Sequence, residues 1–382
     1  MIKESNRLNS VKEYYFSKKL REVAKLIQSG KPIINMGIGS PDLFPSKSVI
    51  DTLKNSLKDQ GAHKYQSYQG LLELRKAISE FYLKFFDVQS NPVNEVLPLM
   101  GSKEGIMHIS LAFLNPGDEV LIPNPGYPTY SSVTKLVEAT PIFYDLSKEN
   151  NWFPDLLDLE KKDLSRVKIM WINYPHMPTG SSATINQFKD LIDFSKKHKI
   201  LLINDNPYSF ILNNDFVSLL SIKNAKENCM ELNSLSKAFN LSGWRVGMLL
   251  GSKENISSVL KVKSNMDSGM FYGIQKGAIQ ALNLDNKWFD SLNVTYSKRR
   301  VLMWELASIL KCEVDKSSKG LFVWAKLPVG INSSEQFINN ILTEKNIFIT
   351  PGIIFGSNGE GYIRFSLCID EEKIKEAIKR FK

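Results

Sequence analysis

The segment 233–247 constrains this chain most, because it places one lysine among serines and one arginine eight residues later. It reads Asn-Ser-Leu-Ser-Lys-Ala-Phe-Asn-Leu-Ser-Gly-Trp-Arg-Val-Gly, and Lys237 and Arg245 are its only charged residues. The apolar stretches 229–232 and 246–250 on either side are typical of short buried strands. Lys237 is therefore expected on a turn between two strands, where catalytic groups commonly collect.

The chemistry of these side chains points to a phosphorylated aldehyde. A lysine amine can form a Schiff base, and a guanidinium can hold a phosphate through a bidentate, charge-assisted hydrogen bond. Neighbouring hydroxyls such as that of Ser234 can add donors to the same phosphate. This combination is what a pyridoxal 5'-phosphate enzyme needs. The competing interpretation is a solvated surface loop, and the flanking apolar stretches argue against it.

Composition excludes several other classes of protein. The chain has 382 residues with 43% hydrophobic and 23% charged residues, which fits a globular protein of two domains. Its net charge of +9 comes from lysines scattered among acids, so we expect no nucleic-acid partner. No apolar run reaches membrane-spanning length, and the three cysteines and four histidines show no metal-ligand spacing. We therefore expect a cytoplasmic protein with no membrane contact and no metal.

The order of apolar stretches predicts an α/β fold. A helical arm at 11–27 and a strand at 33–36 come first, and from residue 46 helices alternate with short strands at 96–100, 119–122, 142–144, 168–173, 200–204, 229–232 and 246–250. Long helices through 284–310 precede strands at 321–325 and 362–366 and a helix at 334–345. We predict a large domain at 46–283 and a smaller α+β domain at 284–382, which the arm 1–45 completes.

Three further motifs follow predicted strands of the large domain. Gly101, Ser102 and Lys103 open a helix, where free backbone N–H groups and the helix dipole favour an anion. Tyr127 follows the next strand and offers a ring for stacking on a planar cofactor. Asp205 ends a buried strand, where a carboxylate needs a partner such as a protonated pyridine nitrogen. Each motif alone also has a plain reading, as a turn, a core tyrosine or a helix cap.

Taken in chain order, these motifs resemble the class I/II aminotransferases, the fold-type I pyridoxal-phosphate family, across nearly the whole chain. The resemblance implies a large domain with a mostly parallel, mixed sheet flanked by helices, beside a smaller α+β domain. Segments 101–106, 124–128 and 263–271 resemble the LL-diaminopimelate aminotransferases more than the aspartate enzymes. Aspartate, glutamate, alanine, methionine and aromatic amino acids remain open as substrates.

The resemblance also implies roles for individual residues. Lys237 would carry the Schiff base and act as general acid/base, with Asp205 on the ring nitrogen and Tyr208 on the ring hydroxyl oxygen. The backbone of Gly39 and the side chain of Arg364 would bind the substrate carboxylate.

Phosphate contacts are implied in the same way. The backbone of residues 101–103, Ser234 and Arg245 would hold the phosphate of the same subunit, and Tyr65 would reach the phosphate of a neighbouring subunit. That role of Tyr65 implies a homodimer with shared active sites. A surface aromatic turn is the equal alternative for Tyr65. Tyr130, three residues after Tyr127, is interpreted as core.

One position departs from the family pattern. The segment that begins at Asn173 reads Asn-Tyr-Pro-His-Met-Pro-Thr-Gly, where the family has Asn-Pro-Thr-Gly, so Met177 replaces an asparagine that donates to the ring oxygen. A thioether cannot donate. We therefore expect Tyr208 to hold that oxygen, with His176 or Asn173 as candidate helpers, and the pKa of the Schiff-base nitrogen to be higher than in relatives with asparagine.

The resemblance implies a ping-pong transfer of an amino group from an amino acid to a 2-oxo acid. A non-transaminating enzyme on the same scaffold, such as a C–S β-lyase or a decarboxylase, is the main alternative, because it would share the cofactor-holding residues. A pyridoxal-phosphate-binding regulator without turnover is a further alternative.

Overall fold

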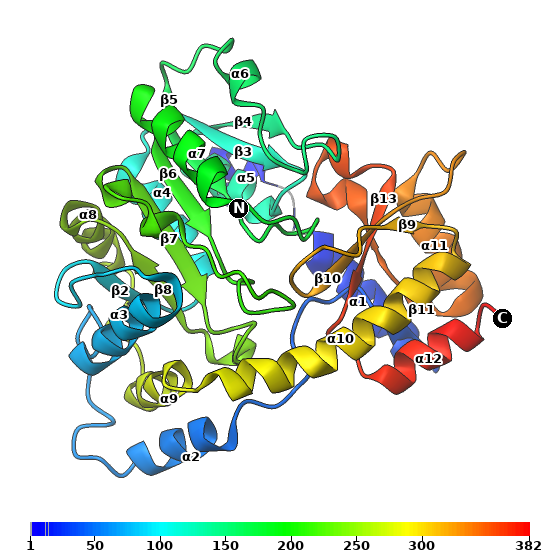
Figure 1. Ribbon diagram of the computed structural model, residues 1–382, viewed down its shortest axis with the longest axis horizontal. Coiled ribbons are helices and arrows are strands. Elements are labelled where there is room, and N and C mark those ends of the chain that lie inside the picture. Colours follow the sequence, from blue (N-terminus) through cyan, green and yellow to red (C-terminus); the bar gives the residue numbers. More distant parts are fainter. Residues whose placement is uncertain (1, 12, 14) are drawn as a thin grey trace.

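The computed structural model describes residues 2–11, 13 and 15–382, and its largest unit is a seven-stranded sheet flanked by helices (Figure 1). The strands run in the order β2-β8-β7-β6-β5-β3-β4. Their bounds are β2 Val96–Leu99, β3 Glu119–Asn124, β4 Thr140–Asp145, β5 Val167–Ile172, β6 Leu201–Asp205, β7 Cys229–Ser234 and β8 Gly247–Leu250. β8 is antiparallel to both of its neighbours, and the other pairs are parallel. The predicted α/β class with a mostly parallel, mixed sheet is confirmed.

The burial of these strands explains why they could be predicted from the sequence. β2, β3, β7 and β8 are buried along their whole length, as strands covered on both faces are. Such strands appear as continuous apolar runs, and the predicted strand ends differ from the observed ones by at most two residues.

The helices of this unit are α2 Lys47–Ser56, α3 Leu72–Phe86, α4 Ser102–Phe113, α5 Pro128–Leu136, α6 Leu156–Leu159, α7 Ile185–Lys197, α8 Lys253–Lys263 and α9 Tyr272–Leu282. Four of them, α4 to α7, connect strands of the sheet, whereas α2 and α3 precede β2 and α8 and α9 follow β8. α7 begins with a capping box, in which Thr184 Oγ1 accepts the backbone N–H of Gln187 at 3.2 Å and Gln187 Oε1 accepts that of Thr184 at 2.9 Å. α5 begins at a proline, whose fixed φ and missing N–H suit the first helical position.

A second, smaller unit is built on an antiparallel sheet in the order β12-β13-β10-β9. Its strands are β9 Glu313–Val314, β10 Phe322–Lys326, β12 Thr350–Pro351 and β13 Tyr362–Ser366, and its helices are α10 Asn286–Ile309, α11 Ser334–Lys345 and α12 Glu371–Lys379. The long helices expected through 284–310 are one helix, α10, which runs from α9 to the small unit in Figure 1.

The N-terminal arm joins the small unit through strand pairing. Its helix is α1 Tyr15–Gln28, and its strand β1 Ile34–Asn35 pairs in parallel with β11 Ile347–Phe348. The predicted arm helix at 11–27 also covered residues 12 and 14, which lie outside the described residues. The boundaries at 45/46 and 283/284 stay a prediction.

Loop 173–182 links the large unit to the small unit. The Gly180 N–H donates to the His176 carbonyl at 2.6 Å, and the Gly180 carbonyl accepts the N–H of Lys319 in the small unit at 2.7 Å. Gly180 has a φ of +78°, and a Cβ there would lie 2.7 Å from the Lys319 carbonyl oxygen, so glycine allows this close approach.

None of the helices in the described part of the chain is both long enough and apolar enough to cross a membrane.

Candidate active site

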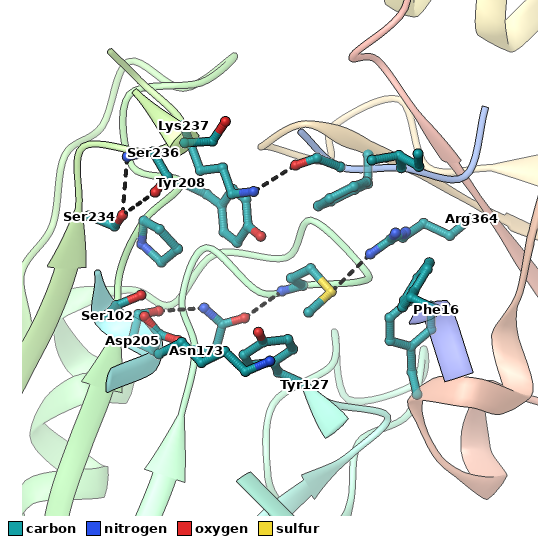
Figure 2. A pocket seen from close by; sticks show the side chains of 18 of the residues that line it. Phe16, Ser102, Tyr127, Asn173, Asp205, Tyr208, Ser234, Ser236, Lys237 and Arg364 are labelled. Atoms are coloured by element: carbon teal, nitrogen blue, oxygen red, sulfur yellow. Dashed lines mark hydrogen bonds between the residues drawn. The ribbon is translucent and has the colours of Figure 1, made fainter. Parts of the chain in front are cut away.

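The carboxyl ends of the parallel strands converge on one cavity. Residues that follow β2, β3, β5, β6 and β7 line a space of about 290 Å³, and α1, β10 and β13 close it from the side of the small unit (Figure 2). Ligands of open α/β sheets bind outside the carboxyl ends of the strands, so this is the expected location of a functional site.

Lys237 follows β7 and extends into this cavity. Its Nζ donates a hydrogen bond to the carbonyl oxygen of Gly39 at 2.6 Å (Figure 2), which brings two predicted residues together. Burial lowers the pKa of Lys237, and the charges of Arg364 and Arg245 act in the same direction. A lowered pKa leaves more of the amine neutral, and the neutral form is the one that attacks an aldehyde.

The turn from β2 into α4 forms a cationic end of the cavity. Gly101 is the N-cap of α4 with a φ of +88°, and a Cβ there would lie 2.1 Å from Nη2 of Arg245. Arg245 donates through Nη1 to the Ser242 carbonyl at 2.8 Å and lines the cavity with Ser102 and Lys103. Burial lowers the pKa of Lys103, and the charge of Arg245 adds to this effect. The helix start and these two cations suit an anion such as phosphate.

Serine hydroxyls complete this end. Ser234 is the last residue of β7, and its Oγ donates to Oγ of Ser236 at 2.8 Å (Figure 2). Ser234 and Ser236 both line the cavity. Ser102, Lys103, Ser234 and Arg245, which were predicted to lie at the phosphate, therefore all line the same cavity. Gly101 contributes a turn that leaves room for the Arg245 guanidinium.

Asp205 ends β6 and is almost fully buried, with 5% of its surface exposed. The Tyr130 hydroxyl donates to Oδ2 at 2.9 Å, whereas Oδ1 is buried and has no hydrogen-bond partner among the described residues. Burial raises the pKa of Asp205 to about 6, although the Tyr130 hydrogen bond and the charge of Lys237 oppose the shift. A buried acceptor without a partner is unfavourable, and a protonated ring nitrogen would supply the missing donor.

A second carboxylate, Glu231, lies on the neighbouring strand β7 and is fully buried. It accepts hydrogen bonds from Asn204 at 3.1 Å, Asn206 at 3.2 Å and Ser218 at 2.9 Å, and from one backbone N–H at 3.0 Å. Asn204 also accepts the backbone N–H of residue 174 at 3.0 Å, which ties loop 173–182 to the same network. Glu231 therefore holds both residues that flank Asp205.

Two aromatic hydroxyl side chains lie where a planar ring would fit. Tyr127 is the N-cap of α5 and Tyr208 follows β6, and both line the cavity. Tyr208 is buried, its ring centroid lies 5.9 Å from that of Phe322, and burial raises the pKa of its hydroxyl, which keeps it a donor at neutral pH. Tyr130 was predicted as core and is fully buried, but it also lines the cavity and binds Asp205.

Arg364 lies in β13 and is 4% exposed. Its guanidinium carbon lies 3.9 Å from the ring centroid of Phe322, 4.7 Å from that of Phe355 and 5.4 Å from that of Phe16. Nη2 donates to the Gly37 carbonyl at 3.0 Å. A guanidinium that lines a cavity among aromatic rings is a strong site for a carboxylate, because little water competes for it.

Met177 lines the cavity and contacts Arg364. Its Sδ accepts a hydrogen bond from Nη1 of Arg364 at 3.3 Å (Figure 2). Asn173 is occupied by the backbone, because it donates to the Asp205 carbonyl and accepts the N–H of Met177 at 2.8 Å. His176 pairs with a threonine hydroxyl at 2.8 Å, does not line the cavity, and has a pKa that burial lowers to about 3. These contacts favour Tyr208 as the donor to a ring hydroxyl.

The sequence missed the apolar side of the cavity, which Phe16, Leu20, Ile38, Phe322 and Phe355 line. Their signal in the sequence was ordinary apolar periodicity, which does not separate cavity walls from core.

Tyr65 is the one predicted site residue that lies apart from these groups. It is 89% exposed and does not line the cavity of its own chain.

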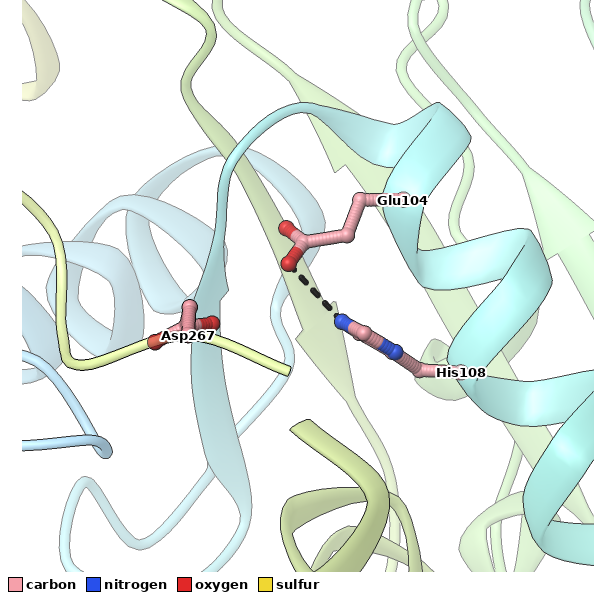
Figure 3. Close-up of side chains that lie close together, drawn as sticks. All are labelled: Glu104, His108 and Asp267. Carbon is pink, nitrogen blue, oxygen red and sulfur yellow. Dashed lines mark hydrogen bonds and ion pairs between the residues drawn. The ribbon is translucent and has the colours of Figure 1, made fainter. Parts of the chain in front are cut away.

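A separate polar cluster fixes the start of α4. His108 Nε2 lies 2.8 Å from Oε1 of Glu104, and Asp267 lies close to both (Figure 3). Asp267 binds Nζ of the buried Lys263 at 2.7 Å, and Lys263 also donates to the Tyr68 carbonyl at 3.1 Å. Since an internal lysine already neutralises the carboxylate, the cluster ties α4 to the segments that contain Tyr68 and Asp267.

The cavity meets the requirements of pyridoxal 5'-phosphate. Oδ1 of Asp205 has no hydrogen-bond partner among the described residues, the glycine turn leaves room for Arg245 at the cationic end, and Lys237, whose pKa is lowered, lines the same cavity as Arg364.

Comparison with known proteins agrees with this geometry. Residues 31–381 match the family described as aminotransferase class I and II. The LL-diaminopimelate aminotransferase of Aquifex aeolicus is 38% identical, with 100% of this chain and 99% of that protein covered, and the one of Halothermothrix orenii is 37% identical, with 100% and 98% covered.

Among solved structures, the substrate-bound structure of BacF from Bacillus subtilis superposes with a TM-score of 0.95 at 32% identity, covering 100% of this chain and 97% of that one. A probable N-succinyldiaminopimelate aminotransferase from Thermus thermophilus gives a TM-score of 0.88 at 29% identity, covering 96% and 98%. The chain therefore belongs to the class I and II aminotransferases and is a pyridoxal 5'-phosphate-dependent transaminase.

Proposed function

We propose that the protein moves an amino group from an L-α-amino acid to a 2-oxo acid by a ping-pong reaction, with Lys237, Asp205 and Tyr208 as its catalytic residues. When bound, the cofactor supplies an aldehyde that takes up the amino group and a ring that withdraws electrons. The observation that carries the proposal is the meeting of three groups in one cavity: the partly buried amine of Lys237, a carboxylate oxygen of Asp205 without a partner among the described residues, and the buried guanidinium of Arg364.

Lys237 acts first as a nucleophile and then as a general base and acid. Burial lowers the pKa of its amine, which suits Lys237 to take a proton from the α-carbon of the amino acid and to give a proton back. The Gly39 carbonyl holds Nζ at 2.6 Å and so orients the amine.

Asp205 would keep a proton on the nitrogen of a bound ring, and the Tyr130 hydrogen bond keeps the carboxylate oriented. Tyr208 would donate to the ring hydroxyl oxygen, and Tyr127 would offer its ring for stacking. The two roles are supported by their common position at the carboxyl ends of β6 and β3.

Two sets of residues at opposite ends of the cavity would bind anionic groups of the cofactor and the substrate. Arg245, Ser234 and the backbone at residues 101–103 would hold the phosphate, and Arg364 with the Gly39 backbone would hold the α-carboxylate of the substrate. A bidentate guanidinium–carboxylate pair among aromatic rings is typically strong and directional.

The proposal includes a homodimer in the cytoplasm. Tyr65 is almost fully exposed in the single chain, and a neighbouring subunit's phosphate would give this ring a partner. The names of the relatives place LL-diaminopimelate among the candidate donors, and amino-acid biosynthesis is the setting that those names support.

A half-reaction tests the proposal. The purified yellow protein is mixed with one amino acid at a time and without any oxo acid, and the absorbance of the cofactor and the products are followed. We expect conversion of the cofactor to its amine form with one equivalent of 2-oxo acid. Release of ammonia while the cofactor stays in its aldehyde form would contradict transamination and indicate a lyase.

A further inference from the structure

We infer that the amino donor has an apolar side chain, and that Phe16, Leu20, Ile38 and Phe355, here called the apolar wall, select it. The inference rests on the proposed function and names its substrate class. This donor class differs from LL-diaminopimelate, the compound in the names of the relatives, because LL-diaminopimelate carries an ammonium and a carboxylate at its distal end as well.

Two anchors determine where the donor's side chain lies. Lys237 Nζ and Arg364 Nη2 contact the same short segment, through the carbonyl oxygens of Gly39 at 2.6 Å and Gly37 at 3.0 Å. Ile38 stands between these glycines, and its side chain lines the cavity. A donor with its amino group at Lys237 and its carboxylate at Arg364 therefore has its α-carbon close to Ile38.

The wall is assembled from distant parts of the chain. Phe16 and Leu20 lie one helical turn apart on α1, and Phe355 ends the short helix η5 Gly352–Phe355. The ring centroids of Phe16 and Phe355 are 6.4 Å apart with an interplanar angle of 55°. Figure 2 shows Phe16 beside Arg364. Aromatic rings at this spacing can contact a third ring, and an apolar side chain gains in proportion to the area that it buries.

Apart from Arg364, the charged side chains that line the cavity come from other elements than the residues of the wall. Lys103 lies in the first turn of α4, Asp205 ends β6, and Lys237 and Arg245 lie in the segment after β7. Of the described residues that line the cavity, Arg364 is the one charged side chain in contact with the wall, and it takes the α-carboxylate. Among the described residues of the wall, the distal ammonium and carboxylate of LL-diaminopimelate would lose water without gaining a partner of opposite charge.

A comparison of two donors tests the inference in the holoenzyme. We expect kcat/KM of the half-reaction to be at least about tenfold higher for L-phenylalanine than for LL-diaminopimelate, the size of discrimination that apolar pockets provide. An equal or higher value for LL-diaminopimelate overturns the inference and leaves the proposed transamination intact. If no amino acid converts the cofactor, the proposed function fails and the inference fails with it.

A binding measurement separates recognition from turnover. The dissociation constant of 3-phenylpropanoate, which has no amino group, is measured by calorimetry for wild type, Phe16→Lys and the matched control Phe16→Leu. Phe16→Lys should weaken binding at least about tenfold, whereas Phe16→Leu should change it little, because leucine keeps the wall apolar. Equal binding by both variants overturns the role of the wall. Ile38→Asp replaces Phe16→Lys if thermal melting shows that the latter does not fold.

Discussion

Asp205 and Glu231 are two carboxylates buried on neighbouring strands, and each depends on a different kind of partner. Glu231 is surrounded by neutral donors of the protein, including Asn204 and Asn206. Asp205 has Tyr130 on one oxygen and no partner from the described residues on the other. At the level of single residues, Asp205 is therefore the buried carboxylate whose ionised form lacks a hydrogen-bond donor among the described residues.

Because the ionised carboxylate is unfavourable there, removing its charge should stabilise the folded protein, and this effect should depend on pH. In the protein without cofactor, Asp205→Asn should raise the free energy of unfolding at pH 8 by about 1–3 kcal/mol, since one pKa unit corresponds to about 1.4 kcal/mol. Burial raises the pKa from the ordinary value of 3.8 to about 6 in the folded state. The unfavourable contribution of the ionised group is therefore complete above about pH 6 and vanishes below about pH 4.

Urea denaturation of both proteins at pH 8 and pH 4 measures this difference. Asp190→Asn, at an exposed position on α7, is the control and should leave stability unchanged at both pH values. A difference between Asp205→Asn and wild type that grows on acidification would contradict the explanation.

Met177 makes a prediction about the bound cofactor. Met177→Asn should restore a donor near the ring hydroxyl oxygen and lower the pH at which the absorbance of the yellow protein changes, because an added donor stabilises the phenolate. Met177→Leu is the matched control without a donor and should leave that pH unchanged. A titration in which both variants shift equally would indicate that the loss of the Sδ contact to Arg364 is responsible instead.

At the scale of elements, the turn between β2 and α4 depends on the absence of a side chain at Gly101. Gly101→Ala should weaken cofactor binding by more than about tenfold, because its Cβ would collide with the Arg245 guanidinium that the anion requires. Gly117→Ala is a close control: Gly117 has the same φ of +88°, but nothing lies within 4 Å of its Cβ position. Both variants share the backbone strain, so equal loss of affinity in a fluorescence titration would refute the collision.

Residues at strand ends and helix starts are the part of the site that the sequence could predict. Strand ends and helix starts carry local signals, so Lys237, Asp205 and the residues after β2 were found from apolar runs that stop at a polar residue. The resemblance to a family supplied Arg364 and Gly39. The roles of Tyr130 and Glu231 could not be predicted, because their partners come from other elements of the fold: Tyr130 of α5 meets Asp205 at the end of β6, and Glu231 of β7 meets Asn204 and Asn206.

At the scale of the whole molecule, the exposed Tyr65 predicts shared active sites. Tyr65→Ala and Lys237→Ala homodimers should each be nearly inactive, but mixing them under conditions that exchange subunits should recover activity. A mixed dimer contains one complete site, made from Lys237 of one subunit and Tyr65 of the other. Each variant mixed with itself is the control. Absence of recovery, with subunit exchange verified by mass spectrometry, would place Tyr65 outside the active site.

The most direct measurement for the whole account is reductive trapping of the cofactor. Borohydride converts a Schiff base into a stable secondary amine, and peptide mass spectrometry then identifies the modified lysine. We expect one modified residue, Lys237, in the wild type. We expect no modified lysine when Lys237→Ala is treated in the same way. Modification of Lys103, or of several surface lysines without preference, would contradict the assignment of this cavity as the active site.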